Sequence, residues 1–433
     1  MQLTAKTSRE QSLNQTKDFI SIEDKVPLGK AIPLSIQHLF AMFGASVLVP
    51  ILLNIDPATV LFFNGIGTLL YAIITKRKIP AYLGSSFAFI APTALLISNG
   101  YGFQYAQGGF VISGVVFSAV ALLVGVLGIG WINKLFPPAA MGAIVTIIGL
   151  ELAPTAADMA GLTASTIDPK SILVSMITLT AVILSSVLLR GFLKVIPVLI
   201  GVTIGYLTAW AVGMVNFSEF NSANFFVLPQ FHIAKFDINS IMIILPATFV
   251  VIAEHIGHLA VTSNVVGRDL SKNPGLNKSL LGDGCSTIIS GFFGSVPTTT
   301  YGENIGVMAI TKVYSTYVIC GAGVLSIILG FSGKLSALIR SIPNPVIGGV
   351  SILLFGTIAT SGLRTFIDQK VDFSKSRNLI LTSVILIIGL SGVKLSLPGT
   401  AFELKGMALA SVVAIALNLV FIIFDKLGIM NGK

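Results

Sequence analysis

The sequence predicts an all-α polytopic membrane protein with fourteen transmembrane segments in two inverted repeats of seven spans, with short β-strands in two broken spans. Three observations lead to this fold class. Of the 433 residues, 54% are hydrophobic and 10% charged, with a mean hydropathy of +0.91, whereas a soluble domain is about 25% charged. Apolar runs near the length of about 20 residues that crosses a bilayer recur after residue 30. The two halves of the chain also match each other at a nearly constant offset.

Residues 1–30 are polar and mixed in charge, and they lack the apolar stretch and cleavage site of a signal peptide. We expect them to form a cytoplasmic N-terminal segment that is not removed. Cys285 and Cys320 have neither paired spacing nor metal-ligand partners, so we interpret them as packing residues. The net charge of +9 is spread between the apolar segments and not clustered as in a nucleic-acid-binding domain. We therefore expect a lipid bilayer around the chain, no nucleic-acid partner, no metal and no cofactor.

Glycine, proline and charge clusters divide the chain into fourteen apolar segments. They lie near 32–53, 57–75, 81–98, 109–130, 137–157, 171–189, 195–214, 240–262, 279–296, 298–311, 314–331, 342–361, 378–393 and 405–424. The third and tenth segments follow Pro80 and Pro297, contain polar residues and have too few apolar residues for a full crossing. We interpret these two segments as broken helices.

The basic residues predict the orientation, because Lys and Arg accumulate in cytoplasmic loops. Alternate loops form two sets. One set contains fourteen basic residues, namely Lys76, Arg77, Lys78, Lys134, Arg190, Lys194, Arg268, Lys272, Lys278, Lys312, Arg364, Lys370, Lys375 and Arg377. The other contains six, namely Lys170, Lys235, Lys334, Arg340, Lys394 and Lys405. The first set therefore predicts the cytoplasmic face, with both termini on the same side.

An internal repeat relates residues 31–214 to residues 240–425. An offset of 217 residues superposes three pairs of motifs: Gln37-His38 on Glu254-His255, Gly65 and Gly67 on Gly282 and Gly284, and Pro80 on Pro297. Each half has seven spans, and an odd number makes the second half enter from the opposite side. Inverted repeats with broken helices in matching positions are typical of transporters, whose binding site lies where the broken helices meet.

Acidic residues within membrane spans are costly and usually functional. Glu254 and Glu303 lie within apolar segments, and Glu151 lies close to the end of another. His258 is four residues after Glu254, which places both side chains on one helical face. We interpret Glu254 and His258 as a proton-coupling pair, because a buried acid beside a histidine can exchange protons as solvent access alternates. His255 is off that face and is expected to pack.

The broken segments predict backbone donors for a small planar ligand. Thr298 to Tyr301 form a β-prone stretch before Gly302, and Glu303 begins a short helix. An extended stretch ending at Ser86 likewise precedes a half-helix that begins at Phe87. Free N–H groups at two facing helix starts can donate to ligand oxygens while a carboxylate accepts a ring N–H. A pyrimidine dione has the complementary pattern.

Several other residues are candidates for the cavity. Phe87, Tyr301 and Phe355 could cover the faces of a flat ring. Four further residues could support the cavity from behind. Gln37 and His38 correspond to Glu254 and His255 in the repeat, and Ser86 and Asn304 adjoin the breaks.

Four motifs resemble the nucleobase-ascorbate transporter family, also called nucleobase-cation symporter 2, and its uracil-transporting branch most closely. They are Ser35-Ile-Gln-His-Leu-Phe40, Tyr82-Leu-Gly-Ser-Ser-Phe87, Ala253-Glu-His-Ile-Gly-His258 and Tyr301-Gly-Glu-Asn-Ile-Gly306. The family signature in the tenth span is met by Glu303-Asn304-Ile-Gly306, Thr311 and Lys312. The resemblance covers residues 30 to 425.

The resemblance implies a core domain of spans 1–4 and 8–11, at about 31–130 and 240–331, and a gate domain of spans 5–7 and 12–14, at about 137–214 and 342–425. It implies that Glu254 and Glu303 bind the base, that backbone amides at Phe87 and Gly302 contribute, and that His258 supports proton coupling. It also implies a homodimer formed through the gate domain. Glu303, where other branches have glutamine, indicates the uracil branch.

The sequence therefore predicts a secondary active transporter of the inner membrane that imports uracil by proton symport with elevator-like alternating access. One alternative is a purine or xanthine permease of the same family. Another is an anion exchanger on the same inverted-repeat plan, although two carboxylates at the midplane disfavour an anion site. An enzyme is not expected, because the chain lacks a nucleophile motif, a phosphate-binding loop and a Cys/His metal set.

Overall fold

The computed structural model describes residues 19–163, 166–396 and 403–429. The first eighteen residues of the predicted N-terminal segment and the last four of the chain lie outside the described residues. The first half contains α2 (Leu28–Ala41), α3 (Phe43–Leu52), α4 (Pro57–Ile74), β1 (Leu83–Ser85), the 3-10 helix η1 (Phe87–Phe89), α5 (Ile90–Ser98), α6 (Phe103–Leu127), α7 (Gly130–Leu135), α8 (Pro138–Glu151), α9 (Ala153–Met159), α10 (Pro169–Leu188), the 3-10 helix η2 (Gly191–Val195) and α11 (Pro197–Ala211).

The second half repeats this order of long and broken elements. It contains α12 (Ser218–Ser222), α13 (Ile238–Val266), a π turn (Ser271–Gly275), α14 (Leu276–Phe292), β2 (Thr298–Thr300), α15 (Gly302–Thr311), α16 (Thr316–Leu329), α17 (Gly333–Arg340), α18 (Asn344–Asp368), α19 (Ser376–Leu390), β3 (Lys394–Ser396), β4 (Glu403–Lys405) and α20 (Gly406–Lys426). Aspartates followed by proline start α4 and α10. The side chains of Asp56 and Asp168 accept N–H groups of the first turn, where proline needs no partner.

Each of the fourteen predicted apolar segments contains a helix. Eight helical stretches of the described residues are long and apolar enough to cross a membrane, and four apolar stretches are shorter. Two of the eight, Leu28–Leu52 and Pro138–Met159, each combine two successive helices. The segment predicted at 32–53 is interrupted at Met42 and the one at 137–157 at Leu152, so neither is a single continuous helix. Pro154 explains the second break, because its ring has no N–H and clashes with the carbonyl four residues earlier. The β3–β4 pair was not predicted.

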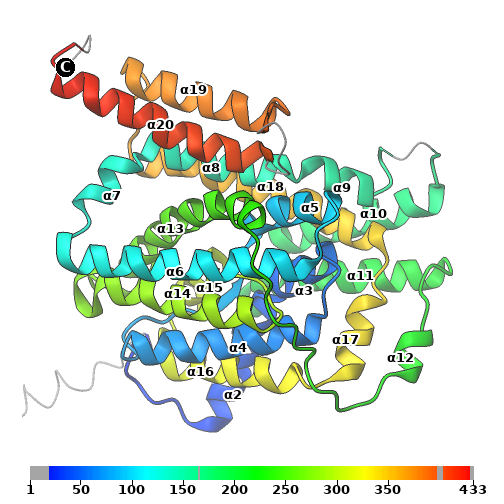
Figure 1. Ribbon diagram of the computed structural model, residues 1–433. Helices are drawn as coiled ribbons and strands as arrows, with labels where there is room; N and C mark the ends of the chain where they lie inside the picture. The colour runs from blue at the N-terminus through cyan, green and yellow to red at the C-terminus, as the bar shows by residue number, and fades with distance from the viewer. Residues whose placement is uncertain (1–18, 164–165, 397–402, 430–433) are drawn as a thin grey trace, which may run out of the picture.

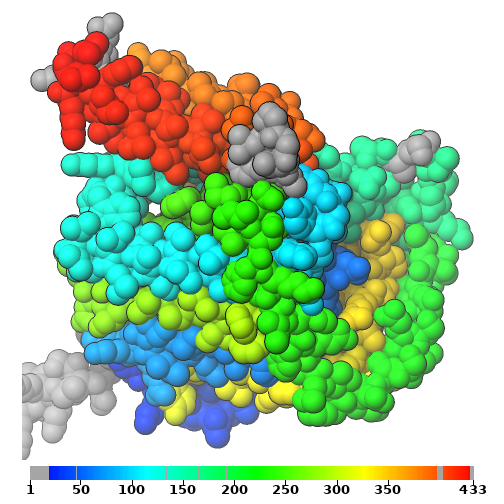
Figure 2. Space-filling view, viewed as in Figure 1, coloured from blue at the N-terminus to red at the C-terminus, as the bar shows by residue number. Residues whose placement is uncertain are grey.

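The helix contacts occur in matched pairs. When each helix is replaced by the corresponding helix of the other half, a contact in the structure becomes another contact that is also present. The contact of α4 with α16 has its counterpart in α14 with α6, and that of α10 with α18 in α19 with α8. The contact of α10 with α11 is likewise matched by α19 with α20. Figure 1 shows α19 and α20 at the top and α2 and α16 at the bottom, and in Figure 2 the adjoining helices α4, α14 and α6 cover one face.

Two groups of helices pack mainly among themselves. The helices of 28–127 contact those of 238–329, and the helices of 138–211 contact those of 344–426. The groups touch mainly where α13 meets α8 and α20 and where α11 meets α3. The binding residues predicted from the sequence fall along this junction.

An ion pair joins two elements on the side opposite the strongly basic loops. Asp56 Oδ1 accepts from Arg340 Nη2 at 2.8 Å and from Ser336 Oγ at 2.6 Å. Burial alone would raise the pKa of the Asp56 carboxyl, but these hydrogen bonds hold the pKa below its usual value. The pair ties the start of α4 to α17, which leads into α18.

Glycines allow the matched helix crossings to be close. A Cβ at Gly65 in α4 would lie 2.4 Å from the Gly323 carbonyl oxygen in α16, and one at Gly114 in α6 would lie 2.7 Å from the Gly284 carbonyl oxygen in α14. Backbone atoms cannot move aside as a flexible side chain would. Both crossings therefore require residues without a side chain.

We expect Gly65→Ala to destabilise the protein by about 1–3 kcal/mol through overpacking. Thermal unfolding of purified protein in detergent measures the change. Gly356→Ala is the matched control, because a Cβ at this helical glycine meets no atom within 4 Å. Equal melting temperatures for the Gly65 variant and the unsubstituted protein would contradict the close crossing.

Candidate functional site

The two broken segments meet in a short antiparallel ribbon. Strand β1 pairs with β2, with Leu83 opposite Thr300, and the Ser86 N–H continues the ladder to the Pro297 carbonyl at 2.9 Å. Each strand leads directly into a helix, η1 after β1 and α15 after β2. The first N–H groups of a helix have no partner within it. The ribbon therefore brings the donor ends of two helices together, as predicted.

A cavity of about 510 Å³ lies beside these helix starts. One wall comes from α2, α3, η1, α13 and α15, and the other from α8, α10, η2, α11 and α18. The cavity thus lies between the two groups of helices. Its lining extends to Lys194 in η2 and Arg364 in α18, which belong to the set of basic residues predicted to be cytoplasmic.

Six of the residues predicted from the sequence line this cavity. They are Phe87, Glu254, His258, Tyr301, Gly302 and Glu303. The cavity lining does not contain the other five, which are buried nearby: Gln37, His38, Ser86, Asn304 and Phe355. The structure thus brings together the acids, the histidine and the helix starts, and it leaves the remaining candidates behind the cavity wall.

His258 has a different partner from the one predicted. Its Nδ1 lies 3.4 Å from the Thr300 Oγ1, and its Nε2 faces Gly302 at 3.6 Å from where a Cβ would lie. Among the described residues no hydrogen bond joins His258 to Glu254. Both side chains lie on one face of α13 and reach the cavity.

Glu254 and Glu303 bring two carboxylates to one cavity from different helices, α13 and α15. Two carboxylates that share a poorly solvated site repel each other when both are charged. Glu303 also lies in the first turn of α15, where the helix dipole and free N–H groups favour a negative charge. The two acids therefore have different surroundings.

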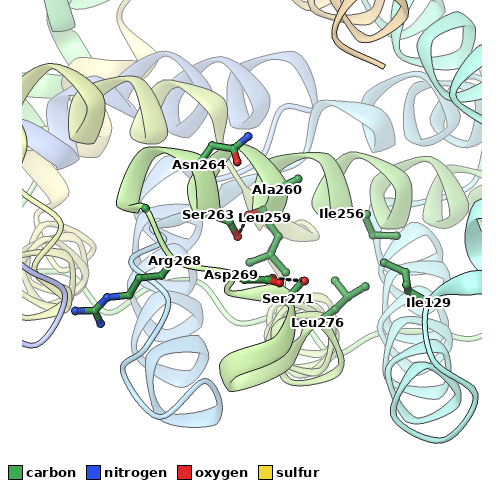
Figure 3. Close-up of a pocket in the computed structure, with 11 residues that line it drawn as sticks. Ile129, Ile256, Leu259, Ala260, Ser263, Asn264, Arg268, Asp269, Ser271 and Leu276 are labelled. Atoms are coloured by element: carbon green, nitrogen blue, oxygen red, sulfur yellow. Dashed lines mark hydrogen bonds between the residues drawn. The ribbon is translucent and has the colours of Figure 1, made fainter. Parts of the chain in front are cut away.

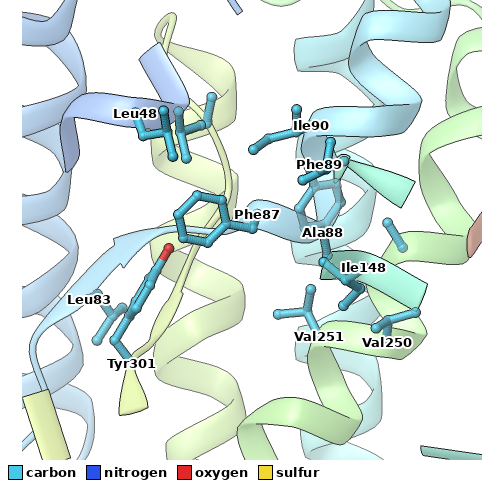
Figure 4. Close-up of a cluster of buried hydrophobic side chains, with 14 of the residues drawn as sticks. Leu48, Leu83, Phe87, Ala88, Phe89, Ile90, Ile148, Val250, Val251 and Tyr301 are labelled. Atoms are coloured by element: carbon cyan, nitrogen blue, oxygen red, sulfur yellow. The ribbon is translucent and has the colours of Figure 1, made fainter. Parts of the chain in front are cut away.

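Aromatic rings close one side of the cavity. Phe87 packs edge-on against Tyr301 with ring centroids 6.1 Å apart, and against Phe355 at 6.2 Å. Figure 4 shows Phe87 beside Tyr301, with Leu48 and Phe89 close by. The Tyr301 hydroxyl donates to the Ser85 carbonyl and so ties the α15 start to β1. Phe355 supports the Phe87 ring and does not face the cavity.

Two further buried acids, Glu151 and Asp283, do not line the cavity. Glu151 accepts the Met407 N–H at 2.9 Å and thereby serves the start of α20, outside the cavity. Asp283 in α14 is fully buried and 2.7 Å from His255 Nδ1, and the sequence analysis missed it. The rule that an acid in an apolar segment needs a partner could have identified Asp283. Because the segment around Asp283 is rich in glycine and serine, its sequence does not indicate how deeply it is buried.

The sequence analysis also missed the polar residues of the opposite wall, which come from α18. Thr357, Ser361 and Arg364 line the cavity there. Their spacing of three to four residues places them on one helical face, and this periodicity could have been used to find them.

Another cavity, of about 540 Å³, lies at the end of α13 that leads to the π turn. Figure 3 shows Ser263, Asn264 and Asp269 around it, with Ile129 on the far side. None of the predicted site residues lines this cavity. Within residues 19–163, 166–396 and 403–429, no group of three or more His, Cys, Asp or Glu side chains is arranged to hold a metal ion.

Comparisons with known proteins agree on the kind of molecule. The Xan_ur_permease model, described as a permease family, matches residues 29–397. The chain is 57% identical over 414 residues to the uracil permease of Paenibacillus larvae, covering 94% of this chain and 98% of the relative. It is 58% identical over 409 residues to the uracil permease of Escherichia coli K12, covering 94% of each.

A solved structure shares the fold. The transmembrane domain of a cyanobacterium bicarbonate transporter superposes with a TM-score of 0.62 at 11% identity, covering 92% of this chain and 99% of that one. At this identity the likeness concerns the fold alone. The family match and the two relatives confirm the resemblance to the nucleobase-ascorbate transporters: the chain belongs to the Xan_ur_permease family of multi-pass membrane permeases and is a transport protein, not an enzyme.

Proposed function

We propose that this permease imports uracil across the inner membrane by proton symport. The observation that carries the proposal is the cavity where two helix starts and two carboxylates converge. Uracil has two ring N–H groups and two carbonyl oxygens in one plane. Carboxylates accept from the N–H groups, and backbone amides donate to the oxygens. The names of the two relatives described above support uracil over other bases.

Each of the six predicted residues that line the cavity has a role in this proposal. Glu303 accepts a ring N–H of uracil, and the N–H groups of Phe87 and Gly302 donate to its carbonyl oxygens. The rings of Phe87 and Tyr301 cover an edge or face of the base. Glu254 contacts the base and carries the coupled proton, and His258 exchanges that proton with the cavity. The remaining predicted residues, Gln37, His38, Ser86, Asn304 and Phe355, brace these groups.

The proposed mechanism moves a core against a gate. The core comprises spans 1–4 and 8–11 and the gate spans 5–7 and 12–14, in two inverted repeats of seven spans. The matched helix contacts and the position of the cavity between the two groups support this division. The cavity reaches Lys194 and Arg364, while the Asp56–Arg340 pair joins elements on the opposite side. This state is therefore proposed to be open to the cytoplasm, where both termini also lie.

The proposal includes a homodimer formed through the gate domain, as the family resemblance implies. The long gate helices α10 and α20 are among the less buried of the spanning helices, with 28% and 39% of their most apolar stretches buried. A partner copy or lipid can cover such faces. Chemical cross-linking in native membranes measures whether the copies meet through these helices.

A competition-binding panel tests the substrate. Purified protein is equilibrated with labelled uracil and challenged with unlabelled uracil, thymine, a 5-halogenated uracil, xanthine and bicarbonate. We expect uracil and its 5-substituted analogues to compete, because they keep the N–H and carbonyl pattern. Stronger competition by xanthine than by uracil would establish the purine alternative, and absence of specific uracil binding together with binding of labelled bicarbonate would establish the anion alternative.

Replacing Gly302 with proline tests the backbone donor directly. Proline is tolerated at the first position of a helix but has no N–H, and Tyr301 before it has φ −124° and ψ 139°, which a residue before proline can adopt. We expect Gly302→Pro to weaken uracil binding by about tenfold, the value of one hydrogen bond. Gly302→Ala keeps the N–H and is the control. Equal binding by both variants would remove this amide from the site.

A further inference from the structure

A buried aspartate–histidine pair lies behind the proposed site and has no role in the mechanism above. Asp283 Oδ2 of α14 and His255 Nδ1 of α13 are 2.7 Å apart, and their side chains are 0% and 1% exposed. A buried carboxylate is costly unless it is paired and hydrogen-bonded. Asp283 therefore fixes the tautomer of His255, because the His255 Nδ1 carries the proton that is donated to the Asp283 carboxylate.

That proton sets the direction of a chain of hydrogen bonds. With Nδ1 protonated, the Nε2 of neutral His255 is an acceptor. It lies 2.7 Å from Ser279 Oγ, so the Ser279 hydroxyl donates to it. The Tyr71 hydroxyl lies 2.6 Å from the same oxygen and donates to Ser279 in turn. The chain runs from Tyr71 to Asp283 with each hydrogen used once.

Thr300 connects this chain to the cavity. Its Oγ1 lies 3.4 Å from the Nδ1 of His255 and 3.4 Å from the Nδ1 of His258. The Thr300 hydrogen cannot go to His255, whose Nδ1 already carries a proton directed at Asp283. It can therefore be donated to His258 Nδ1, which then acts as an acceptor.

We propose that Asp283 and His255 are positioning residues that act through Thr300 to hold the His258 proton on Nε2. This nitrogen faces Gly302 at the start of α15 and therefore the cavity. The inference rests on the proposed role of His258 in proton coupling and deepens it: the network keeps the proton of neutral His258 on Nε2, where it can be donated to the site.

The groups that bear on the titration of His258 come from several elements. Glu254 and His255 lie on α13 itself, Tyr301 and Glu303 lie at the start of α15, and Asp283 lies on α14. A change at Thr300 alters none of these charges. Substitution of Thr300 therefore tests the hydrogen-bond direction separately from electrostatics.

The first experiment reads the tautomer by NMR. The chain has only four histidines, so selective ¹³C/¹⁵N-histidine labelling with a His258→Gln reference assigns the signal of His258. We expect the Nε2–H tautomer in the unsubstituted protein and a shift toward Nδ1–H in Thr300→Val and in Asp283→Leu. Thr300→Ser keeps the hydroxyl and should restore the original tautomer. An Nδ1–H tautomer in the unsubstituted protein, or an unchanged one in Thr300→Val, would overturn the inference.

The second experiment compares binding with the pH profile of uptake. Thr300→Val is expected to bind uracil within about threefold of the unsubstituted protein while its proton-driven uptake falls at least about tenfold and its pH optimum moves. Thr300→Ser should regain the profile. A loss of binding as large as the loss of uptake would assign Thr300 a purely structural role and overturn the inference. Because the tautomer is read without uracil, failure of the proposed function would appear separately, as absent uracil binding in the unsubstituted protein.

Discussion

Glu303→Ala is expected to weaken uracil binding by about 100-fold. The carboxylate lies in the cavity, in the first turn of α15. A hydrogen bond to a charged group contributes about 1.5–3 kcal/mol, and its removal leaves a uracil N–H desolvated without a partner. Since 1.4 kcal/mol is tenfold in affinity, the two effects together give the expected loss. Equilibrium binding of labelled uracil to purified protein measures it.

Two further variants make this test specific. Glu303→Gln keeps an acceptor oxygen without the charge and is expected to bind with intermediate affinity. Glu403→Ala removes a glutamate of β4 that pairs with Lys394 away from the cavity, and should bind normally. If Glu303→Ala bound uracil as tightly as the Glu403 control, Glu303 would not belong to the site.

Glu254→Gln is expected to abolish uphill accumulation of uracil while leaving downhill equilibration. Glutamine resembles the protonated acid but cannot release a proton. The variant can therefore still move uracil across the membrane, but it cannot use the proton gradient to drive uptake. A pH difference of one unit supplies about 1.4 kcal/mol per proton, which allows about tenfold accumulation by the unsubstituted protein. The variant should stop at equal concentrations inside and outside. Uptake of labelled uracil into proteoliposomes measures this ratio.

Glu151→Gln is the matched control for Glu254→Gln. Glu151 is also an acid in an apolar helix, but it accepts the Met407 N–H at the start of α20 and does not line the cavity. A glutamine oxygen can accept the same N–H, so accumulation should persist. Accumulation by Glu254→Gln equal to that of the control would assign proton coupling to another residue.

The parts of the site that depend on local sequence could be predicted. Pro80 and Pro297 marked the two breaks, and the β-prone residues before Gly302 predicted the strand that precedes α15. Glu254 was identifiable because an acid in an apolar helix is costly. The spacing of four residues placed His258 on the same face. These inferences needed only helix geometry and the cost of burying charge.

The parts that depend on contacts between distant segments could not be predicted. Thr300, and not Glu254, is the neighbour of the His258 Nδ1, since β2 brings its hydroxyl there. The Asp283–His255 pair joins α13 and α14 in a way that no periodicity reveals. Phe355 was predicted as a possible ring contact, but its ring packs behind Phe87. The interruption at Met42 has no proline or glycine at the break to mark it.

Uptake of labelled uracil by proteoliposomes, with and without an inward proton gradient, tests the central claim most directly. The protein is predicted to accumulate uracil above the external concentration when the gradient is imposed, and a protonophore should return the internal concentration to equality. Uptake of the same rate and extent with and without the gradient would contradict proton symport.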